Sequence, residues 1–475
     1  MKAKTPKRPK IQPGLKTAPA SKKPKAPPRV AQGDRVRATV AGWTLDGVAL
    51  ATTAHGPTHV VGGVPGDVGD VRILGKGQHQ MWGVIDPTVL EVTSEDRVEP
   101  PCAVVLRCGG CPWQMVSTEH QRQTRRESLA TRLGDAAAKA TWHPLLEAPE
   151  PFGFRTRATM IVRHQGGRLR AGFYEPRSQT LVPAEECSVQ HPLVNRTAKF
   201  ALKEFVSANL PSWRGEERPG LLRALVIRVD PDRDKALLSM VVSQDDPRLP
   251  EIGAALLRID GVVGVSAIIN NRPSGPLAAG EVIQLGGATH LVLRAGEYKV
   301  PVGPLAFTQT HVGAARKMVY AVAGMLPEED GEHLVDLYAG VGVFGLALAD
   351  RAKRVTLVER NPEAAAAARA AVGESSKVTV VEGDAAKVVA DVIGDGVATT
   401  VILDPPRAGC RPEVLAAIAE SAVETVIYVS CGPKALVRDI ARLPGFEMTE
   451  IFEVEMFPHS PHEEVIVKLV RTPTP

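Results

Sequence analysis

Two side chains that can do chemistry follow apolar segments in the C-terminal half of the chain. Asp404 ends the segment 400–404, and Cys431 comes directly after the segment 426–430. Both segments are typical of buried strands, and ligands of open α/β sheets bind at the carboxyl ends of the strands. We therefore expect Asp404 and Cys431 to face one crevice, where the thiolate of the cysteine would act as a nucleophile.

A glycine-rich turn in the same half indicates a nucleotide site. The segment 336–345 reads Asp-Leu-Tyr-Ala-Gly-Val-Gly-Val-Phe-Gly; it follows an expected strand and opens an expected helix. Gly340, Gly342 and Gly345 match the dinucleotide fingerprint, and Glu359 stands where a ribose-binding acid belongs. The same topology binds S-adenosylmethionine, so the motif alone leaves a nicotinamide cofactor and S-adenosylmethionine equally open.

The pairing of Asp404 with Cys431 decides between these cofactors. A dehydrogenase has no use for such a pair, whereas a methyltransferase acting on a pyrimidine carbon does. C5 of uracil is too electron-poor to attack a sulfonium methyl group unaided, and a thiolate that adds at C6 turns C5 into an enolate carbon. The adduct must later lose its C5 proton to a base. The sequence thus favours an S-adenosylmethionine-dependent enzyme that methylates a pyrimidine.

Four cysteines form a separate group further upstream. Cys102, Cys108 and Cys111 stand in a Cys-x5-Cys-Gly-Gly-Cys pattern, and Cys187 lies far downstream of them. Disulfides, which a reducing cytoplasm disfavours, and a tetrahedral zinc site are competing interpretations. Zinc ligands usually come as two close couples, so three close ligands and one distant ligand better suit an iron–sulfur cluster. The radical-enzyme spacing Cys-x3-Cys-x2-Cys is absent, so the sequence gives no support to a radical mechanism.

The elements that must position these residues change in character along the chain. From about residue 301, apolar runs alternate with Ala-rich helical stretches, which predicts an open, mainly parallel α/β sheet. Residues 31–95 read as short strands broken by Gly and Asp, which predicts a small closed barrel of a kind that often binds nucleic acid. The expected strands are 35–40, 59–61, 68–74 and 81–92 in the barrel, and 334–338, 355–359, 378–381, 400–404, 426–430, 446–454 and 465–470 in the C-terminal sheet.

The charge of the chain is unevenly distributed. The net charge is +4, yet residues 1–30 alone carry ten Lys or Arg and no acid. A segment rich in Lys, Pro and Ala cannot bury enough apolar surface to order itself, so we expect a disordered tail with a salt-dependent attraction to polyphosphates such as RNA. No apolar run approaches the roughly 18 residues that cross a bilayer, and none follows the basic N-terminus as in a secretory signal. We therefore expect a cytoplasmic protein without a membrane partner.

With these motifs in place, the chain resembles the family of RNA 5-methyluridine methyltransferases. Members of that family join a TRAM barrel, an iron–sulfur region and a class I methyltransferase domain. Residues 46–49, Asp-Gly-Val-Ala, resemble TRAM. Residues 430–433, Ser-Cys-Gly-Pro, resemble the nucleophile motif Ser-Cys-Asn-Pro, and 457–464 resemble Phe-Pro-x-Thr-x-His-x-Glu. Nearly everything after the tail is covered.

The resemblance implies an α/β fold class: a Rossmann-like class I methyltransferase domain at the C-terminus, an N-terminal OB-like β-barrel, and a central α+β iron–sulfur region. The domains that it implies are a basic tail at 1–30, the TRAM barrel at 31–95, the central domain at 96–300, and the S-adenosylmethionine-dependent domain at 301–475.

The resemblance also implies residue roles. Cys431 would be the nucleophile, Glu464 the base that removes the C5 proton, and Asp404 a contact to cofactor and uracil. In this family the last strand is antiparallel and lies beside the strand of the nucleophile, which would bring Glu464 to the substrate of Cys431. The implied S-adenosyl-L-methionine contacts are Gln309, Tyr338, Gly340, Gly342, Glu359, Asp384 and Asp404, and the implied [4Fe-4S] ligands are Cys102, Cys108, Cys111 and Cys187.

The implied substrate is a uridine in transfer RNA or in large-subunit ribosomal RNA, methylated by a monomer. Arg155 and Arg157 are candidates for holding RNA phosphate. Two alternatives stand beside this reading: an RNA 5-methylcytosine methyltransferase, and a non-catalytic RNA-binding protein. The second predicts loss of the reactive residues, which the sequence does not show.

Cys410 and Glu463 are alternative candidates for the roles of nucleophile and base that we assign to Cys431 and Glu464. Cys410 also follows an Asp-Pro-Pro turn, but the 5-methylcytosine enzymes place one of their two cysteines directly after a proline, where this chain has Arg407. We therefore expect Cys410 to be a buried structural thiol. Glu463 and Glu464 are adjacent and point to opposite faces of a strand, so only one can be the base. The motif selects Glu464, and we expect Glu463 to be a solvated carboxylate.

Overall fold

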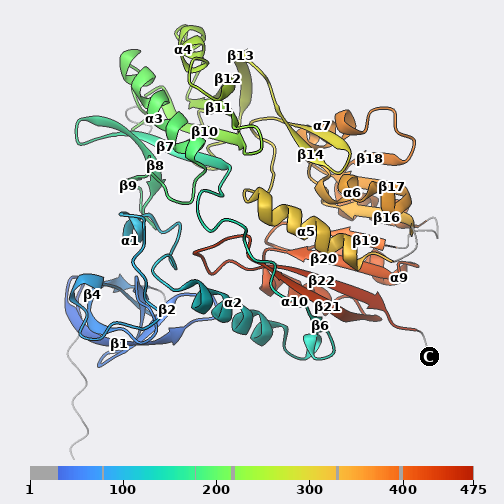
Figure 1. The fold of residues 1–475 in the computed structure, drawn as a ribbon, viewed down its shortest axis with the longest axis horizontal. Helices are drawn as coiled ribbons and strands as arrows, with labels where there is room; N and C mark the ends of the chain where they lie inside the picture. Colours follow the sequence, from blue (N-terminus) through green and yellow to red (C-terminus); the bar gives the residue numbers. More distant parts are fainter. Residues whose placement is uncertain are drawn as a thin grey trace, which may run out of the picture.

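A computed structural model describes residues 30–77, 80–176, 178–214, 220–327, 331–394 and 400–473. The basic tail expected at 1–30 lies, except for Val30, outside the described residues. Figure 1 shows three assemblies of strands: a blue barrel, a green sheet, and an orange-to-red sheet that ends near the C-terminus.

Five strands close the N-terminal barrel. Inward residues alternate with outward residues along each strand, as in Val36, Ala38 and Val40, whose apolar side chains fill the interior. The predicted segment 81–92 stops at Ile85, because Asp86 and Pro87 begin a 3-10 turn and proline cannot continue the ladder. In the order β1-β2-β3-β5-β4, the strands are β1 Arg35–Trp43, β2 Ala49–Thr53, β3 Gly56–Val61, β5 Met81–Ile85 and β4 Val68–Lys76, and the turn is η1 Pro87–Val89.

A mostly irregular segment connects the barrel to the rest of the chain. Its long helix, α2, is capped by the Ser117 hydroxyl, which accepts from the His120 N–H at 3.3 Å. The apolar residues Leu129 and Leu133 of α2 are buried among side chains of the C-terminal sheet. This helix therefore packs against strands that are distant from it in the sequence (Figure 1). The elements of the segment are α1 Val105–Cys108, α2 Thr118–Leu133, η2 Gly134–Ala137 and β6 Thr141–Trp142.

A seven-stranded sheet forms the central assembly. Its strand order is β13-β12-β11-β10-β7-β8-β9, and helices α3 and α4 bury their apolar residues against one face of it. That face carries the even-numbered residues of β7, namely Ala158, Met160 and Val162. The elements are β7 Arg157–Gln165, β8 Arg168–Tyr174, β9 Leu181–Pro183, α3 Pro192–Ser207, β10 Leu222–Asp230, β11 Lys235–Val242, α4 Leu249–Leu256, β12 Val262–Ile269 and β13 Glu281–Gly287.

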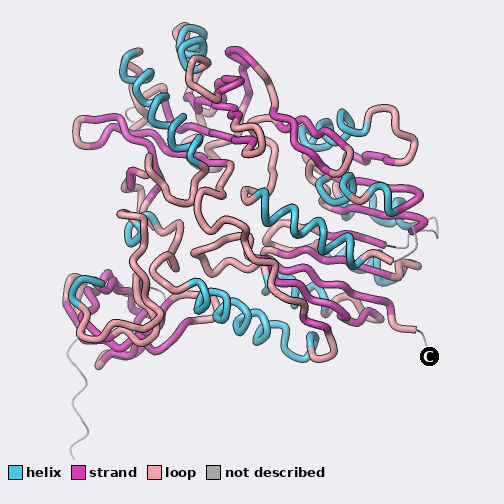
Figure 2. Tube along the Cα trace, viewed as in Figure 1, coloured by secondary structure: helices cyan, strands magenta, loops and turns pink. Residues whose placement is uncertain are grey.

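The C-terminal sheet has eight strands in the order β18-β17-β16-β19-β20-β22-β21-β6. Figure 2 shows helices on both sides of it. Helices α5, α6 and α7 pack on one face, and α2, α8, α9 and α10 pack on the other. Its strands are β16 Gly331–Leu337, β17 Ala352–Glu359, β18 Val378–Glu382, β19 Thr400–Leu403, β20 Thr425–Ser430, β21 Phe446–Val454, β22 Glu464–Arg471 and the edge strand β6.

The remaining elements complete this assembly: the hairpin β14 Leu291–Ala295 and β15 Tyr298–Val302, and the helices α5 Val312–Met325, α6 Val343–Ala347, η3 Ala349–Arg351, α7 Pro362–Val372, α8 Ala385–Ile393, α9 Pro412–Glu420 and α10 Pro433–Ile440. Because helices cover both faces, every residue of β19 and β20 is buried, which explains why their sequences are apolar apart from Thr400, Thr425 and Ser430.

The predicted fold class is confirmed: an N-terminal five-stranded barrel precedes a mixed α/β arrangement whose C-terminal sheet is covered by helices on both faces. The seven strands expected in the C-terminal sheet are all present, to within three residues at their ends. The edge strand β6 is not predicted, because two residues are too few to show the alternation of apolar and polar side chains that marks a strand. In the described part of the chain, no helix has the length and apolar character needed to cross a membrane.

Candidate active site

The carboxyl ends of three parallel strands meet at one edge of the C-terminal sheet. The register pairs Leu337 of β16 with Leu403 of β19, and Leu403 with Tyr428 of β20. The residues that follow these strands, including Asp404 and Cys431, therefore emerge at the same edge. This is the edge at which open α/β sheets bind their ligands.

Glu464 reaches the same edge because its strand runs the other way. β22 pairs with β20 in antiparallel register, with Ser430 opposite Val465. One step further along the ladder, Cys431 leaves β20 where Glu464 enters β22. The antiparallel last strand expected from the resemblance is thus present.

The carboxylate of Glu464 is buried, and no hydrogen bond from the described residues offsets its loss of water. Its side chain is 1% exposed, and neither of its oxygens has a hydrogen-bond partner among the described residues. Burial raises its pKa well above the usual value; the nearby Asp404 carboxylate raises it further, and Arg407 opposes the rise. A buried, unpartnered carboxylate with a raised pKa has the character of a general base.

Cys431 is half-buried and shares this environment. Burial raises the pKa of its thiol, Glu464 and Asp404 raise it further, and Arg407 lowers it. Burial also raises the pKa of the half-buried Asp404 to about 7. Three acidic groups therefore lie together, and the charge of Asp404 disfavours ionisation of both Cys431 and Glu464.

Arg407 is the residue that the sequence reading missed. The sequence motifs mark Arg407 only as the position where another enzyme class has a cysteine. In the structure its positive charge acts on Cys431, Glu464 and His462. A Cβ on Gly432 would lie 3.0 Å from the Arg407 carbonyl oxygen, so the two loops run close together. Its place directly after the Asp-Pro-Pro turn was the signal available in the sequence.

The glycine-rich turn is fixed by two carboxylates. The Gly345 N–H donates to Asp336 Oδ2 at 2.8 Å, and the Gly340 N–H donates to Glu359 Oε2 at 2.8 Å. Gly340 and Gly342 have φ of +57° and +85°, a conformation that glycine adopts without strain. A Cβ built on Gly340 would meet no atom within 4 Å, so the turn opens onto free space at this residue.

The other expected cofactor residues surround this turn with varied roles. Tyr338 has a φ of +65°, and its hydroxyl is buried without a hydrogen-bond partner among the described residues. Asp384 caps helix α8 by accepting from the Ala386 N–H at 3.1 Å, and it pairs with Arg411 at 2.9 Å. Gln309 is half-buried, just before helix α5.

The structure agrees with the prediction for the surroundings of Cys410 but not with the prediction for Glu463. Cys410 is 4% exposed, with its sulfur 3.8 Å from the Tyr428 hydroxyl, and burial raises its pKa to about 12. The expected burial of this thiol is confirmed, and its structural role stays a prediction. The expectation that Glu463 is solvated is wrong: it is 6% exposed, because its segment packs against α2 near Ser128 and Arg132, and burial raises its pKa to about 7.

The four upstream cysteines line one cavity of about 1670 Å³, although Cys187 lies far from the others in sequence. All are free thiols. Burial raises the pKa of Cys111 to about 12, and Cys187, Cys108 and Cys102 add to the rise, so the thiols share one neighbourhood. Among the described residues, no three His, Cys, Asp or Glu side chains are grouped tightly enough to hold a metal ion. This cavity also contains Arg155, one of the candidates for holding RNA phosphate.

Comparison with known proteins gives three findings. A family model described as conserved hypothetical protein 95 matches residues 313–441. A protein of Thermosynechococcus vestitus, described as an uncharacterized RNA methyltransferase, is 31% identical over 419 residues, 86% of this chain and 91% of the relative. One of Clostridium tetani with the same description is 27% identical over 442 residues, 90% and 94% of the two chains.

Among solved structures, the crystal structure of Pyrococcus abyssi tRNA (uracil-54, C5)-methyltransferase in complex with S-adenosyl-L-homocysteine is similar over most of the molecule. The TM-score is 0.74 at 25% sequence identity, and the match covers 91% of this chain and 99% of that one.

Proposed function

This chain belongs to the RNA methyltransferase family, and we propose that it transfers a methyl group from S-adenosyl-L-methionine to C5 of a uridine in transfer RNA or large-subunit ribosomal RNA. The observation that carries the proposal is the antiparallel register of β22 on β20, which sets Glu464 beside Cys431 at the edge where Asp404 also emerges. The similarity to a solved tRNA (uracil-54, C5)-methyltransferase supports it.

The residues divide the chemistry into an opening and a closing step. The Cys431 thiolate forms a bond to C6 of the uracil, and the electron pair of the C5–C6 double bond moves toward C5 and O4. When bound, S-adenosyl-L-methionine supplies the electrophilic methyl group that C5 accepts. Glu464 then takes the proton from C5, the C5–C6 double bond re-forms, and the C6–S bond breaks with its electrons returning to sulfur.

Positioning of the reactants and general-base catalysis each have a known effect on reaction rates. Holding the reacting groups together can lower the barrier by about 7 to 11 kcal/mol, and a positioned base typically adds a factor of about 10² to 10⁴. Arg407 lowers the pKa of Cys431 and of Glu464, and so opposes the effect of the Asp404 charge on both groups.

The cofactor residues fit S-adenosyl-L-methionine. We assign to it Gln309, Tyr338, Gly340, Gly342, Glu359, Asp384 and Asp404. The free space in front of Gly340 lets a ligand approach the backbone. Glu359 ends β17 at the carboxyl edge, where a ribose-binding acid belongs.

We assign a [4Fe-4S] cluster to Cys102, Cys108, Cys111 and Cys187. The support is their convergence on one cavity as free thiols. A cuboidal cluster offers one iron to each of four thiolates, so its ligands stand farther apart than those of a single metal ion. The absence of a tight single-ion group among the described residues is compatible with that spacing.

The experiment that tests the proposed function is product identification. RNA incubated with the protein and S-adenosyl-L-methionine is hydrolysed to nucleosides and analysed by mass spectrometry. We expect 5-methyluridine. A product that is instead 5-methylcytidine, or RNA binding without any methyl transfer, would contradict the proposal. Comparing 5-methyluridine positions in total RNA from cells with and without the protein then identifies the modified uridine.

A further inference from the structure

A second hollow lies in the central sheet, away from the reactive residues. Its volume is about 930 Å³, and residues of β7, β8, β9, β10 and three loops line it. The odd-numbered residues of β7, including Thr159, Ile161 and Arg163, face it. Because side chains alternate across a sheet, this face is opposite to the one that α3 and α4 cover.

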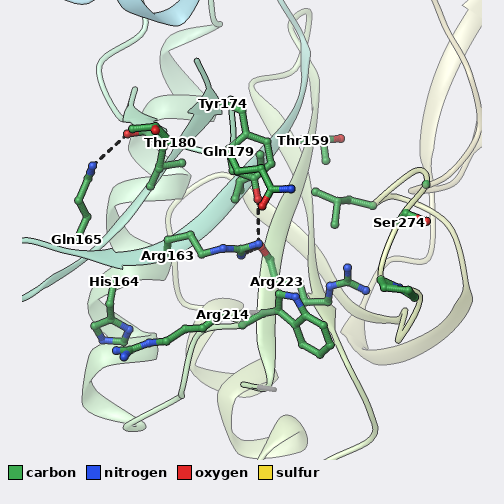
Figure 3. A pocket seen from close by; sticks show the side chains of 16 residues that line it. Thr159, Arg163, His164, Gln165, Tyr174, Gln179, Thr180, Arg214, Arg223 and Ser274 are labelled. Carbon is green, nitrogen blue, oxygen red and sulfur yellow. Dashed lines mark hydrogen bonds between the residues drawn. The ribbon is translucent and has the colours of Figure 1, made fainter. Parts of the chain in front are cut away.

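The cavity concentrates positive charge. Arg163, Arg214 and Arg223 all line it, and none of the sixteen lining residues of the described chain is acidic. The Arg163 guanidinium donates to the carbonyls of Val162 and Arg223 and to the Tyr174 hydroxyl, and within the described part of the chain no carboxylate is paired with it. Figure 3 shows its side chain reaching across the cavity toward Tyr174.

The Arg223 guanidinium has a hydrogen-bond donor, Nε, that no described residue accepts from. Its side chain is 3% exposed, and its Nε has no hydrogen-bond partner among the described residues. Its Nη1 donates to the carbonyl and the side chain of Asn270. Burial lowers its pKa, and the neighbouring Arg163 lowers it further. A buried guanidinium beside another, with no described acid between them, is a site for an anion.

The walls offer flat and hydrogen-bonding groups beside this charge. The Arg223 guanidinium lies over the Trp213 ring at 4.7 Å, and Tyr174 faces Arg163. Further polar side chains at the mouth are Gln165, Gln179, Thr180 and Ser274. Guanidinium planes and aromatic rings are the surfaces on which unpaired RNA bases stack, and guanidinium groups bind phosphate.

On the same face of the sheet, a series of contacts connects β7 with the segment that carries Gln309, a candidate cofactor contact. Arg157, six residues before Arg163 on β7, pairs in register with Arg228 of β10. Arg228 in turn donates to the Thr308 hydroxyl at 2.6 Å, next to Gln309. Six residues of strand span about 20 Å, so the cavity and the reactive end are separated by a length of several nucleotides.

From these observations we infer that the cavity binds an unpaired nucleotide of the substrate RNA, several nucleotides away from the methylated uridine. Its phosphate contacts the guanidinium groups of Arg163 and Arg214, and its base lies against the wall formed by Tyr174 and the Arg223–Trp213 stack. This inference rests on the proposed function only in taking RNA as the substrate.

The test uses the full-length protein and a fluorescein-labelled 20-nucleotide polyuridylate, with Kd measured by anisotropy over a range of salt concentrations. The test variant combines Arg214→Gln with Ser274→Glu, two exposed lining positions. The control combines Arg258→Gln with Ala254→Glu, exposed positions on and after α4 that change the net charge equally. We expect Kd to rise about tenfold in the test variant, and the slope of log Kd against log salt to fall by about 0.7 for the lost arginine contact.

Three outcomes would overturn the inference: wild-type protein that does not bind the probe at low salt, equal Kd values for test and control variants, or a test variant that loses uridine 5′-monophosphate binding while binding the probe as the control does. The last would make the cavity a site for free nucleotides. Methyl transfer is assayed separately. A protein that makes no 5-methyluridine but loses RNA binding in the test variant would contradict the proposed function and leave this inference standing.

Discussion

At the scale of single residues, the reactive site joins groups that suppress one another's ionisation. In the proposed mechanism Cys431 and Glu464 must both be deprotonated, yet burial and the neighbouring carboxylates raise both pKa values. Arg407 is the positive charge that lowers the pKa of both. Its guanidinium therefore sets the pH at which nucleophile and base become available.

Replacing Arg407 should accordingly move the pH dependence of the reaction. Removing a positive charge raises the pKa of a nearby acid, so Arg407→Gln should shift the ascending limb of the single-turnover rate to higher pH, and Arg407→Lys should restore part of the shift. Rates are measured across pH at saturating RNA. An unshifted limb with a lower plateau would mean that Arg407 only contacts RNA.

Iron content tests the four cysteine ligands individually. Anaerobically purified protein should contain about four iron atoms and four sulfides per chain. Cys111→Ala should lose most of both, because the remaining thiols no longer hold every iron, whereas Cys431→Ala should retain them. Iron is measured by mass spectrometry and sulfide colorimetrically. Equal iron in the two variants would refute the ligand assignment.

At this scale, short motifs in the sequence assign candidate roles to side chains, but the motifs do not predict the surroundings of those side chains. Cys431, Glu464 and Cys410 could be sorted by their positions in short motifs. The burial of Glu463 could not, because it depends on α2, which lies more than 300 positions away in sequence yet packs against that segment. The influence of Arg407 likewise arises only when two loops approach in space.

At the scale of elements, the close packing of helix α6 on the sheet holds the glycine-rich turn. A Cβ on Gly345 would lie 2.2 Å from Leu357 Cδ2 and 3.1 Å from Asp336. Gly345→Ala should therefore destabilise the C-terminal assembly by about 1 to 3 kcal/mol. In helix α5, Gly324 has no atom within 4 Å of its would-be Cβ, so Gly324→Ala should stabilise by about 0.5 to 1 kcal/mol.

Thermal unfolding followed by circular dichroism compares these two variants. Opposite shifts of the midpoint, down for Gly345→Ala and up for Gly324→Ala, are expected. Similar shifts in both would show that the tight contact at Leu357 relaxes at no cost.

The strands of the C-terminal sheet were largely predictable, because strands buried on both faces give mainly apolar runs. The strand 446–454 was placed to the residue. Other elements escaped. They include β2, where Ala and Thr give a weak pattern, β6, which is two residues long and joins the sheet only through its pairing with β21, and most strands of the central sheet, such as β7, β8 and β12.

At the scale of the whole molecule, the barrel touches the segment that carries the base. Asp46 pairs with Arg132 of α2 and with Lys434 of α10, both at 2.9 Å. A Cβ on Gly47 would lie 2.0 Å from the Cβ of Pro461, three residues before Glu464. The barrel loop is therefore part of what holds the base segment in place.

A matched pair of glycine substitutions tests this contact. Gly47 and Gly56 both have positive φ, but only Gly47 meets other atoms. Gly47→Ala should slow turnover because it displaces the base segment, whereas Gly56→Ala should cost only the backbone strain of about 1 to 2 kcal/mol. Steady-state methyl transfer and thermal midpoints are measured for both. Equal turnover would show that the barrel does not support the base.

The covalent step itself can be observed on a denaturing gel with labelled RNA and S-adenosyl-L-methionine. Glu464→Gln should accumulate protein attached to methylated RNA, because the C5 proton is no longer removed and the C6–S bond stays closed. Cys431→Ala should give neither adduct nor product. An adduct that persists in Cys431→Ala, or a full yield of 5-methyluridine from it, would contradict the assignment of the nucleophile.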